Sequence, residues 1–237
     1  MAIETTYRTD AEEMMDDFSL SNEALITALK DLSRINLLLG GNNVTRNGVS
    51  QLLKNIPRDR EITIMDFGCG GGDLLRMLAD FGQKNNRKFR LIGVDANETA
   101  IQFAREHSVA YPNIEFITAD IFKTDFKGFQ PDIALLTLTL HHFKDPDIKE
   151  ILHILYEDVS LGIVVNDLQR SKLAYRLFQA VIFVFRLEPM TAQDGLISIL
   201  RGFKRKDLVL FSEQLNFTKC RIRWKWAFRW QWIIHKL

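Results

Sequence analysis

Cysteine is scarce in this chain of 237 residues, which has only Cys69 and Cys220. Two cysteines so far apart indicate neither a disulfide framework nor a cysteine-rich metal cluster. Long apolar runs are also missing, since the longest, residues 180–185, is far too short to cross a bilayer. The first ten residues are polar and acidic, unlike a secretory signal peptide. We therefore expect a cytoplasmic protein without a membrane span.

Net charge is small as well, because 31 basic residues face 30 acidic ones and leave a formal charge of +1. Such a chain has no strong overall field to attract nucleic acid. Its hydrophobic fraction of 46% is ordinary for a soluble globular protein, and its length suits one α/β domain. We expect a small-molecule partner and no nucleic acid.

Apolar segments alternate with helical ones through the middle of the chain. These segments are near-continuous apolar runs, which is typical of parallel strands covered on both faces. Parallel sheets of this kind bind ligands at the carboxyl ends of their strands. The predicted strands are residues 62–67, 89–95, 114–120, 132–140 and 161–167, and the predicted helices are 73–81, 98–107 and 146–158.

The two ends of the chain follow other patterns. Helical spacing predicts helices at 20–39 and 45–56, and the terminal segment 218–237 alternates as an antiparallel hairpin does. We therefore predict an α/β fold with a seven-stranded mixed sheet and helices on both faces. The domain organisation expected is a helical lid at 1–56 and a ligand-binding unit at 57–237, together one structural domain.

The most informative stretch is the glycine-rich loop MDFGCGGGD, residues 65–73, which follows the first predicted strand. A strand, a glycine turn and a helix start make a nucleotide site, because the helix start presents free N–H groups. Gly68 and Gly70 fit the first two glycines of the dinucleotide pattern G-x-G-x-x-G, but Asp73 takes the third position. Asp66 would repel a pyrophosphate and attract a cation. The loop therefore favours a ligand with a positively charged amino group.

This loop resembles motif I of the class I S-adenosylmethionine-dependent methyltransferases, and the likeness continues along the chain. Asp95 ends the second strand, where this family binds both ribose hydroxyls with an acid; a carboxylate can accept two hydrogen bonds from a diol. Asp120 and Ile121 resemble the family's adenine contact. The sequence LTLHHF at 138–143 is similar to the small-molecule branch that includes the quinone-biosynthesis enzymes.

Two further segments carry local likeness, one at 34–45 to the lid of related methyltransferases and one at 165–203 to enzymes encoded near polyketide synthases. The resemblance as a whole implies a Rossmann-like fold, S-adenosylmethionine as cofactor and S-adenosylhomocysteine as its product. The alternative for each acid is that it caps the next helix. The cofactor contacts that the resemblance implies are Thr45, Asp66, Gly68, Cys69, Gly70, Gly72, Asp95, Ala96, Asp120, Ile121 and Leu138.

Two adjacent histidines follow the fourth predicted strand, at the edge where the ligand is expected. A base helps methyl transfer to a phenol, because a phenol has a pKa of about 10. His141 or His142 is the candidate base, and Asp167 at the end of the fifth strand is the candidate orienting group. Two alternatives stay open: the histidines stabilise the fold, or the methyl group goes to carbon or nitrogen and no strong base is needed.

A metal is not expected. Asn166 and Asp167 offer the oxygen ligands that magnesium prefers. The magnesium-dependent catechol methyltransferases also have an acid at the end of the fourth strand, whereas Asp132 lies at the opposite end of that strand.

The acceptor pocket is expected in the inserted region 171–203, with Arg170, Tyr175 and Phe178 as candidate contacts. The first helix of this region has one narrow polar stripe. The simplest interpretation is that its apolar side chains pack in a lid or in the core. The alternative is an apolar mouth for a lipophilic acceptor, with peripheral contact to a membrane. Monomer and dimer both stay open.

Three other functions compete with a small-molecule methyltransferase. Asp73 argues against an NAD-dependent oxidoreductase, and the intact loop with its two acids argues against a non-catalytic scaffold. Methylation of protein or nucleic acid stays open, although the tetrapeptide N/D-P-P-Y/F of amino-methylating enzymes is missing after the fourth strand. We predict methyl transfer to a small aromatic or lipophilic acceptor such as a phenol, quinol or polyketide.

Overall fold

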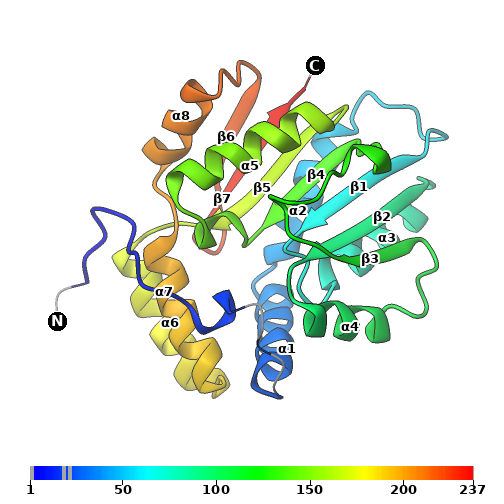
Figure 1. The fold of residues 1–237 in the computed structure, drawn as a ribbon. Helices are drawn as coiled ribbons and strands as arrows, with labels where there is room; N and C mark the ends of the chain where they lie inside the picture. Colours follow the sequence, from blue (N-terminus) through cyan, green and yellow to red (C-terminus); the bar gives the residue numbers. More distant parts are fainter. Residues whose placement is uncertain (1–2, 18–19, 21–22, 237) are drawn as a thin grey trace.

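The computed structural model describes residues 3–17, 20 and 23–236, and its centre is a seven-stranded sheet (Figure 1). The strand order is β3-β2-β1-β4-β5-β7-β6. The first five strands along the chain pair in parallel, and β7 runs antiparallel to both β5 and β6. The expected mixed sheet is confirmed. The strands are β1 (Ile62–Phe67), β2 (Phe89–Asp95), β3 (Ile114–Thr118), β4 (Ile133–Thr137), β5 (Gly162–Leu168), β6 (Cys220–Lys225) and β7 (Arg229–His235).

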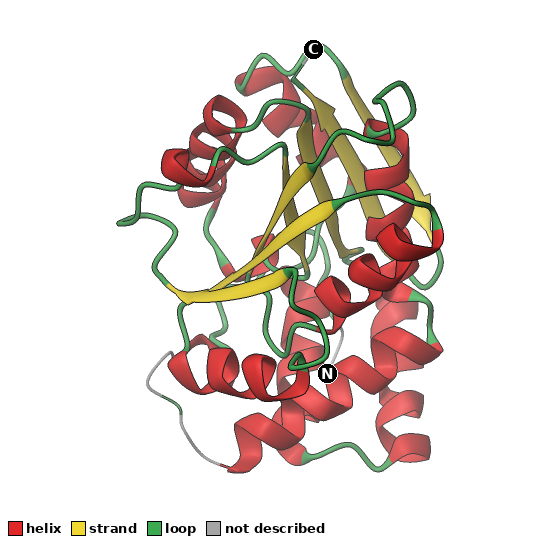
Figure 2. Ribbon diagram, turned by 90° about the vertical axis from the view of Figure 1, so that its right-hand side faces the viewer, coloured by secondary structure: helices red, strands yellow, loops and turns green. Residues whose placement is uncertain are grey.

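Helices cover both faces of the twisted sheet, as Figure 2 shows. One apolar core packs α2, α3 and α4 against the sheet, and a second packs α5 and α8 against it. Among the described residues no helix is long and apolar enough to span a membrane. The helices are α1 (Glu23–Leu38), α2 (Gly41–Leu52), α3 (Asp73–Lys84), α4 (Glu98–His107), α5 (Asp145–Asp158), α6 (Lys172–Phe185), α7 (Pro189–Arg201) and α8 (Arg205–Gln214), with short 3-10 turns η1 (Met14–Asp16), η2 (Lys127–Phe129) and η3 (Leu140–His142).

A separate group of helices, α1, α6 and α7, lies at the edge where the parallel strands end (Figure 1). Helix α7 contacts both α1 and α6. Residues 3–17, here called the N-terminal strap, lie along α7, where the Thr9 N–H donates to the carbonyl of Leu200 over 3.3 Å. The fold therefore builds a cover over the carboxyl ends of the strands.

Some predicted boundaries were wrong. β4 ends at Thr137 and not at residue 140, because Leu138 has a left-handed backbone (φ 57°) and leaves the sheet. β3 ends at Thr118, and α2 begins at Gly41 and not at residue 45. The expected start of the first helix at 20–22 includes residues outside the described part of the chain. The division at residue 56 stays a prediction.

Candidate functional site

The glycine loop leaves β1 at the sheet edge and turns back at once. The N–H groups of Gly68 and Cys69 donate to the carbonyl of Val94 over 2.8 and 3.1 Å, so the loop is anchored to β2. A Cβ on Gly68 would lie 2.7 Å from Oγ1 of Thr139, so a glycine is needed here to accommodate the Thr139 side chain. A Cβ on Gly70 would meet only Leu29, at 3.4 Å, among the described residues. Gly70 therefore faces open space, where a ligand can approach the backbone.

Asp66, beside this loop, is a buried carboxylate without a partner for one oxygen. Its residue is 2% exposed, and its Oδ1 has no hydrogen-bond partner in the described part of the chain. Burial raises its pKa well above the usual range, and the negative charges of Asp73 and Asp95 raise it further. An ammonium group placed here would remove both penalties. The structure therefore fits the cationic ligand that the loop predicts.

Asp95 ends β2 next to the loop and accepts two backbone hydrogen bonds. Its Oδ2 accepts from the Gly70 N–H over 2.9 Å, and its Oδ1 accepts from the Asn97 N–H over 3.0 Å. Burial raises its pKa although these hydrogen bonds lower it. The side chain that caps α4 is Asn97, which accepts from the Ala100 N–H over 3.0 Å. The helix-capping alternative for Asp95 is thus wrong.

Asp120 is more exposed than the other two acids. Its carboxylate pairs with Lys123 over 2.8 Å, and it also accepts from the Phe122 N–H over 2.9 Å. The pKa of Asp120 is lowered, mainly by the Lys123 ammonium and then by this backbone hydrogen bond. Asp120 and Ile121 line the same cavity as Asp66 and Asp95.

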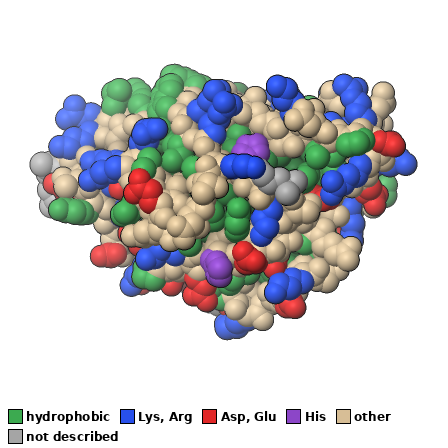
Figure 3. All heavy atoms as spheres, turned by 90° about the horizontal axis from the view of Figure 1, so that it is seen from above, with side chains coloured by type: hydrophobic (Ala, Val, Ile, Leu, Met, Phe, Trp, Pro, Cys, Tyr) green, Lys and Arg blue, Asp and Glu red, His purple; other side chains and the backbone are tan. Residues whose placement is uncertain are grey.

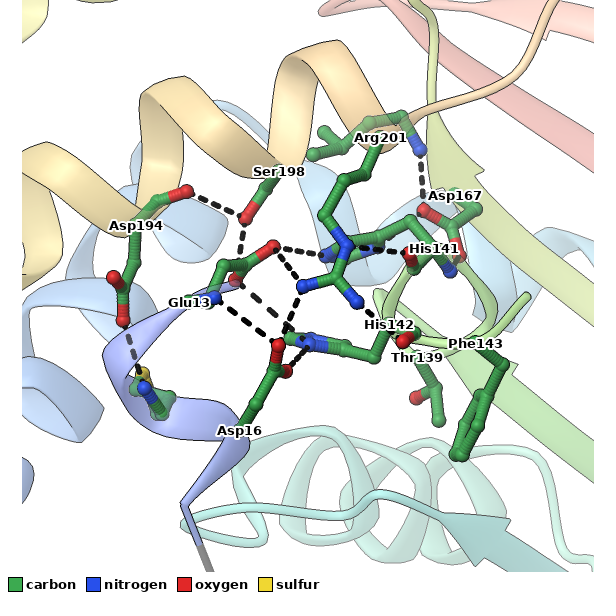
Figure 4. A network of polar contacts seen from close by, with 12 residues as sticks. Glu13, Asp16, Thr139, His141, His142, Phe143, Asp167, Asp194, Ser198 and Arg201 are labelled. Atoms are coloured by element: carbon green, nitrogen blue, oxygen red, sulfur yellow. Dashed lines mark hydrogen bonds and ion pairs between the residues drawn. The ribbon is translucent and has the colours of Figure 1, made fainter. Parts of the chain in front are cut away.

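The two histidines sit on η3 and point to different carboxylates (Figure 4). Nδ1 of His141 lies 2.7 Å from Oδ1 of Asp167, and Nδ1 of His142 lies 2.6 Å from Oδ1 of Asp16. Burial alone would raise the pKa of Asp167, but the two histidines and backbone N–H groups hold it below its usual value. Asp167 is therefore ionised, fully buried, and placed to fix the ring of His141.

The N-terminal strap brings a second carboxylate, that of Glu13, close to these histidines, and no sequence motif marks this residue. Oε1 of Glu13 lies 3.8 Å from Nε2 of His141 and has no hydrogen-bond partner among the described residues. Ser198 donates to Oε2 of Glu13 over 2.8 Å. Burial raises the pKa of Glu13 to about 7, although His142, Ser198 and Arg201 oppose the rise. Glu13 thus changes protonation state close to neutral pH.

Three arginines fasten the strap to the rest of the site. Arg201 of α7 pairs with Asp16 and donates to the carbonyls of His141 and His142. Arg8 pairs with Asp145 over 2.7 Å and donates to the carbonyls of His141 and Phe143. Arg170 donates to the carbonyls of Thr5, Thr6 and Gly202 and to the carboxylate of Asp207. These bonds hold the strap across the end of β4 and the start of α8.

Glu13, His141 and His142 also place candidate metal-ligand atoms within 4.8 Å of one another. Arg201 already lies 3.6 Å from Oε1 of Glu13, where its guanidinium supplies the positive charge that a metal would bring. We therefore assign no metal role to this cluster.

One cavity of about 2100 Å³ joins the loop, the histidines and the helices of the cover. This volume exceeds the roughly 300–1,000 Å³ of an ordinary ligand pocket, so two ligands fit side by side. Four candidate residues, Thr45, Gly72, Asp167 and Tyr175, do not line it; Thr45 lies inside α2, 0% exposed, bound to Thr137 and Asn166. The candidates that do line it are Asp66, Gly68, Cys69, Gly70, Asp95, Ala96, Asp120, Ile121, Leu138, His141, His142, Arg170 and Phe178.

A family described as "Methyltransferase domain" matches residues 64–162, from β1 to the start of β5. This central part of the chain is therefore similar to a methyltransferase domain. Solved methyltransferases share its fold: the plantazolicin methyltransferase BpumL in complex with SAH has a TM-score of 0.65 at 14% identity, over 93% of this chain and 98% of its own. Magnesium protoporphyrin IX methyltransferase from Synechocystis PCC 6803 has a TM-score of 0.55 at 15% identity, over 86% and 82%.

Two curated proteins resemble parts of this chain. One is 2-phytyl-1,4-naphtoquinone methyltransferase of Thermosynechococcus vestitus, 36% identical over 64 residues, which are 27% of this chain and 27% of that protein. The other is carboxy-S-adenosyl-L-methionine synthase of Campylobacter lari, 22% identical over 69% of this chain and 73% of its own. These matches bear out the resemblance to the class I S-adenosylmethionine-dependent methyltransferases, and the neighbours solved with SAM or SAH agree with the expected cofactor. The role of each site residue stays a prediction.

Proposed function

We propose that this methyltransferase transfers a methyl group from S-adenosylmethionine to a small aromatic or lipophilic acceptor. The unpartnered, buried carboxylate of Asp66 beside the open backbone of Gly70 carries the assignment of the donor site. Asp66 would bind the amino group of the cofactor, and Asp95 its ribose hydroxyls. When bound, S-adenosylmethionine supplies a methyl group on a positively charged sulfur.

On the acceptor side, His141 supplies the base. The ionised carboxylate of Asp167 accepts a hydrogen bond from the Nδ1–H group, so Nε2 carries the free lone pair. While the acceptor oxygen receives the methyl group that the cofactor would supply, Nε2 of His141 would take up the hydroxyl proton. The positive charge of the sulfonium would then end on the imidazolium of His141, so charge and atoms balance. The strap and α7 exclude water from this step.

The lining of the cavity supports an apolar acceptor. Helix α6 contributes Leu177, Phe178, Val181, Val184 and Phe185, with no acid. The donors of Arg170 all go to the strap, to Gly202 and to Asp207, so this residue offers less to an acceptor than its position suggests. A quinol or phenol with an apolar substituent fits these surroundings.

The alternative of an NAD-dependent oxidoreductase finds no support at this site. Three carboxylates, Asp66, Asp73 and Asp95, lie near the loop and each would repel a pyrophosphate. A scaffold without catalysis remains the other alternative, and an activity assay separates it.

Ligand-dependent melting tests the donor site. S-adenosylhomocysteine should raise the melting temperature and NAD should not, because only a ligand of the native state stabilises it. Asp95→Ala should abolish the shift, whereas Asp59→Ala, an exposed acid at the other end of β1, should keep it. A shift with NAD alone would contradict the proposal. Labelled S-adenosylmethionine with a panel of phenols, quinols and polyketide acids then identifies the acceptor.

A further inference from the structure

The outward side of α6 is unusually apolar for a surface helix. Leu173 is 57% exposed, Val184 69% and Phe183 85%, and within α6 only Ala174 is buried. Leu173, Leu177, Ala180 and Val184 follow helical spacing, so they form one exposed apolar edge along the helix. An unpaired helix stripe of this size needs a partner.

The same helix carries a basic edge beside the apolar one. Lys172 and Arg176 are exposed and lie on the adjoining side of the helix together with Phe183. Arg186, which is also exposed, directly follows the last residue of the helix. No aspartate or glutamate occurs within α6. Figure 3 gives a contrast from the opposite end of the molecule, where Lys and Arg side chains are interspersed with acidic ones. A basic edge next to an apolar edge is typical of helices that lie on anionic membranes.

The apolar edge continues into the cavity. Leu177, Ala180 and Val184 are exposed and also line the cavity, so this edge borders the mouth. Trp226, in the turn between β6 and β7, is 64% exposed and lines the cavity too. Tryptophan prefers the boundary between water and lipid.

We propose that α6 docks on an anionic lipid surface, and that a lipid-soluble acceptor enters the cavity along its apolar edge. The docking stands on α6 alone, whereas the entry of an acceptor rests on the proposed function. A second copy of the chain is the less suitable occupant, because pairing two α6 helices would bring the Lys172 and Arg176 side chains of both copies together. An anionic bilayer matches the cations and buries the apolar side chains at the same time.

Co-sedimentation with vesicles tests the docking. The chain should bind vesicles of phosphatidylcholine with phosphatidylglycerol, bind phosphatidylcholine alone far more weakly, and dissociate at high salt. Phe183→Ser and Leu173→Ser, outside the cavity, should each weaken binding at least about tenfold. Lys172→Gln and Arg176→Gln should each weaken it about fivefold. The matched controls are Val109→Ser, 84% exposed beyond α4, and Lys88→Gln, at the start of β2; both should leave binding unchanged.

The outcomes separate docking from methyl transfer. The α6 variants should keep the wild-type melting shift with S-adenosylhomocysteine, because α6 lies apart from the donor loop. Equal binding to both vesicle types, or equal losses in the α6 and control variants, would overturn the docking. A dimer in solution that Phe183→Ser dissociates, without vesicle binding, would assign α6 to a second copy instead. Vesicle binding without any S-adenosylhomocysteine shift would refute the proposed function and leave the docking intact.

Discussion

The carboxylate of Asp167 lies 2.7 Å from Nδ1 of His141, and neither side chain is more than 3% exposed. This pair joins the end of β5 to the turn after β4, so two neighbouring strands position one imidazole. We expect this ionised, buried acid to accept a hydrogen bond from Nδ1–H, which leaves Nε2 free to accept a proton.

Asp167→Asn should remove the carboxylate that fixes the tautomer of the His141 ring. We expect methyl transfer to a hydroxyl acceptor to fall at least about a hundredfold, the contribution of a positioned base, with the S-adenosylhomocysteine shift preserved. Nitrogen-15 NMR should show the His141 ring lose its single tautomer. An unchanged tautomer together with an unchanged rate would refute the assignment.

Asp66→Asn should affect the free and the liganded protein in opposite directions. The free protein should gain stability, because a buried carboxylate near two other acids is replaced by a neutral group. Binding of S-adenosylhomocysteine should weaken about tenfold or more, since a hydrogen bond to a charged group is lost. Calorimetry and thermal melting measure both effects, and a variant that loses stability and keeps affinity would contradict the donor-site role.

Glu13 should make stability fall as pH rises. Its pKa is 4.5 ordinarily and about 7 in the folded chain, so the native state holds one more proton between these values. That difference of about 2.5 units corresponds to about 3 kcal/mol, fully present below pH 4.5 and lost as pH rises through 7.

Urea unfolding of Glu13→Gln measures this contribution at about pH 5, near the lower limit of this range, and at about pH 8, above its upper limit. The variant should lose most of the pH dependence and exceed the wild type at the higher pH. Glu12→Gln, the exposed neighbour, is the matched control and should behave as the wild type does. If the free energy of unfolding changed with pH in the same way in the Glu13 variant and the wild type, Glu13 would be excluded as the cause of the pH dependence.

Arg201→Gln should loosen the strap. The change removes the ion pair with Asp16 and the hydrogen bonds to His141 and His142, and leaves Asp16 without that partner. We expect a loss of about 2–4 kcal/mol in the free energy of unfolding or, if the strap detaches alone, protease cleavage within residues 3–17. Arg58→Gln, exposed before β1, controls for loss of a surface charge. A strap that resists cleavage at wild-type stability would show that Arg201 does not fasten it.

The sequence predicted the parts of this molecule that depend on local pattern. Apolar runs and a glycine loop identified β1 and β2, and the acids at their carboxyl ends, Asp66 and Asp95, lie together because parallel strands share an edge. The end of β4 was mispredicted, because LTL at 138–140 has strand-like composition and only the contacts of Leu138 and Thr139 turn it away.

Glu13 and Asp16 escaped prediction for a different reason. They lie on a short polar turn without a motif, and their partners, His142, Ser198 and Arg201, are more than a hundred residues away along the chain. Pairing over such distances follows from the whole fold and not from spacing. The carboxylate expected beside the histidines, Asp167, was recognisable only because it ends a strand.

The strap also sets an order of events during synthesis. Met14 and Met15 donate their backbone N–H groups to Asp194, and Arg8 donates to the carbonyl of Arg201. Because the strap precedes α7 along the chain, it is synthesised earlier and receives these contacts only after α7 has emerged from the ribosome. Until α7 has been made, the donor loop can already be folded, while the wall around His141 is still open to water.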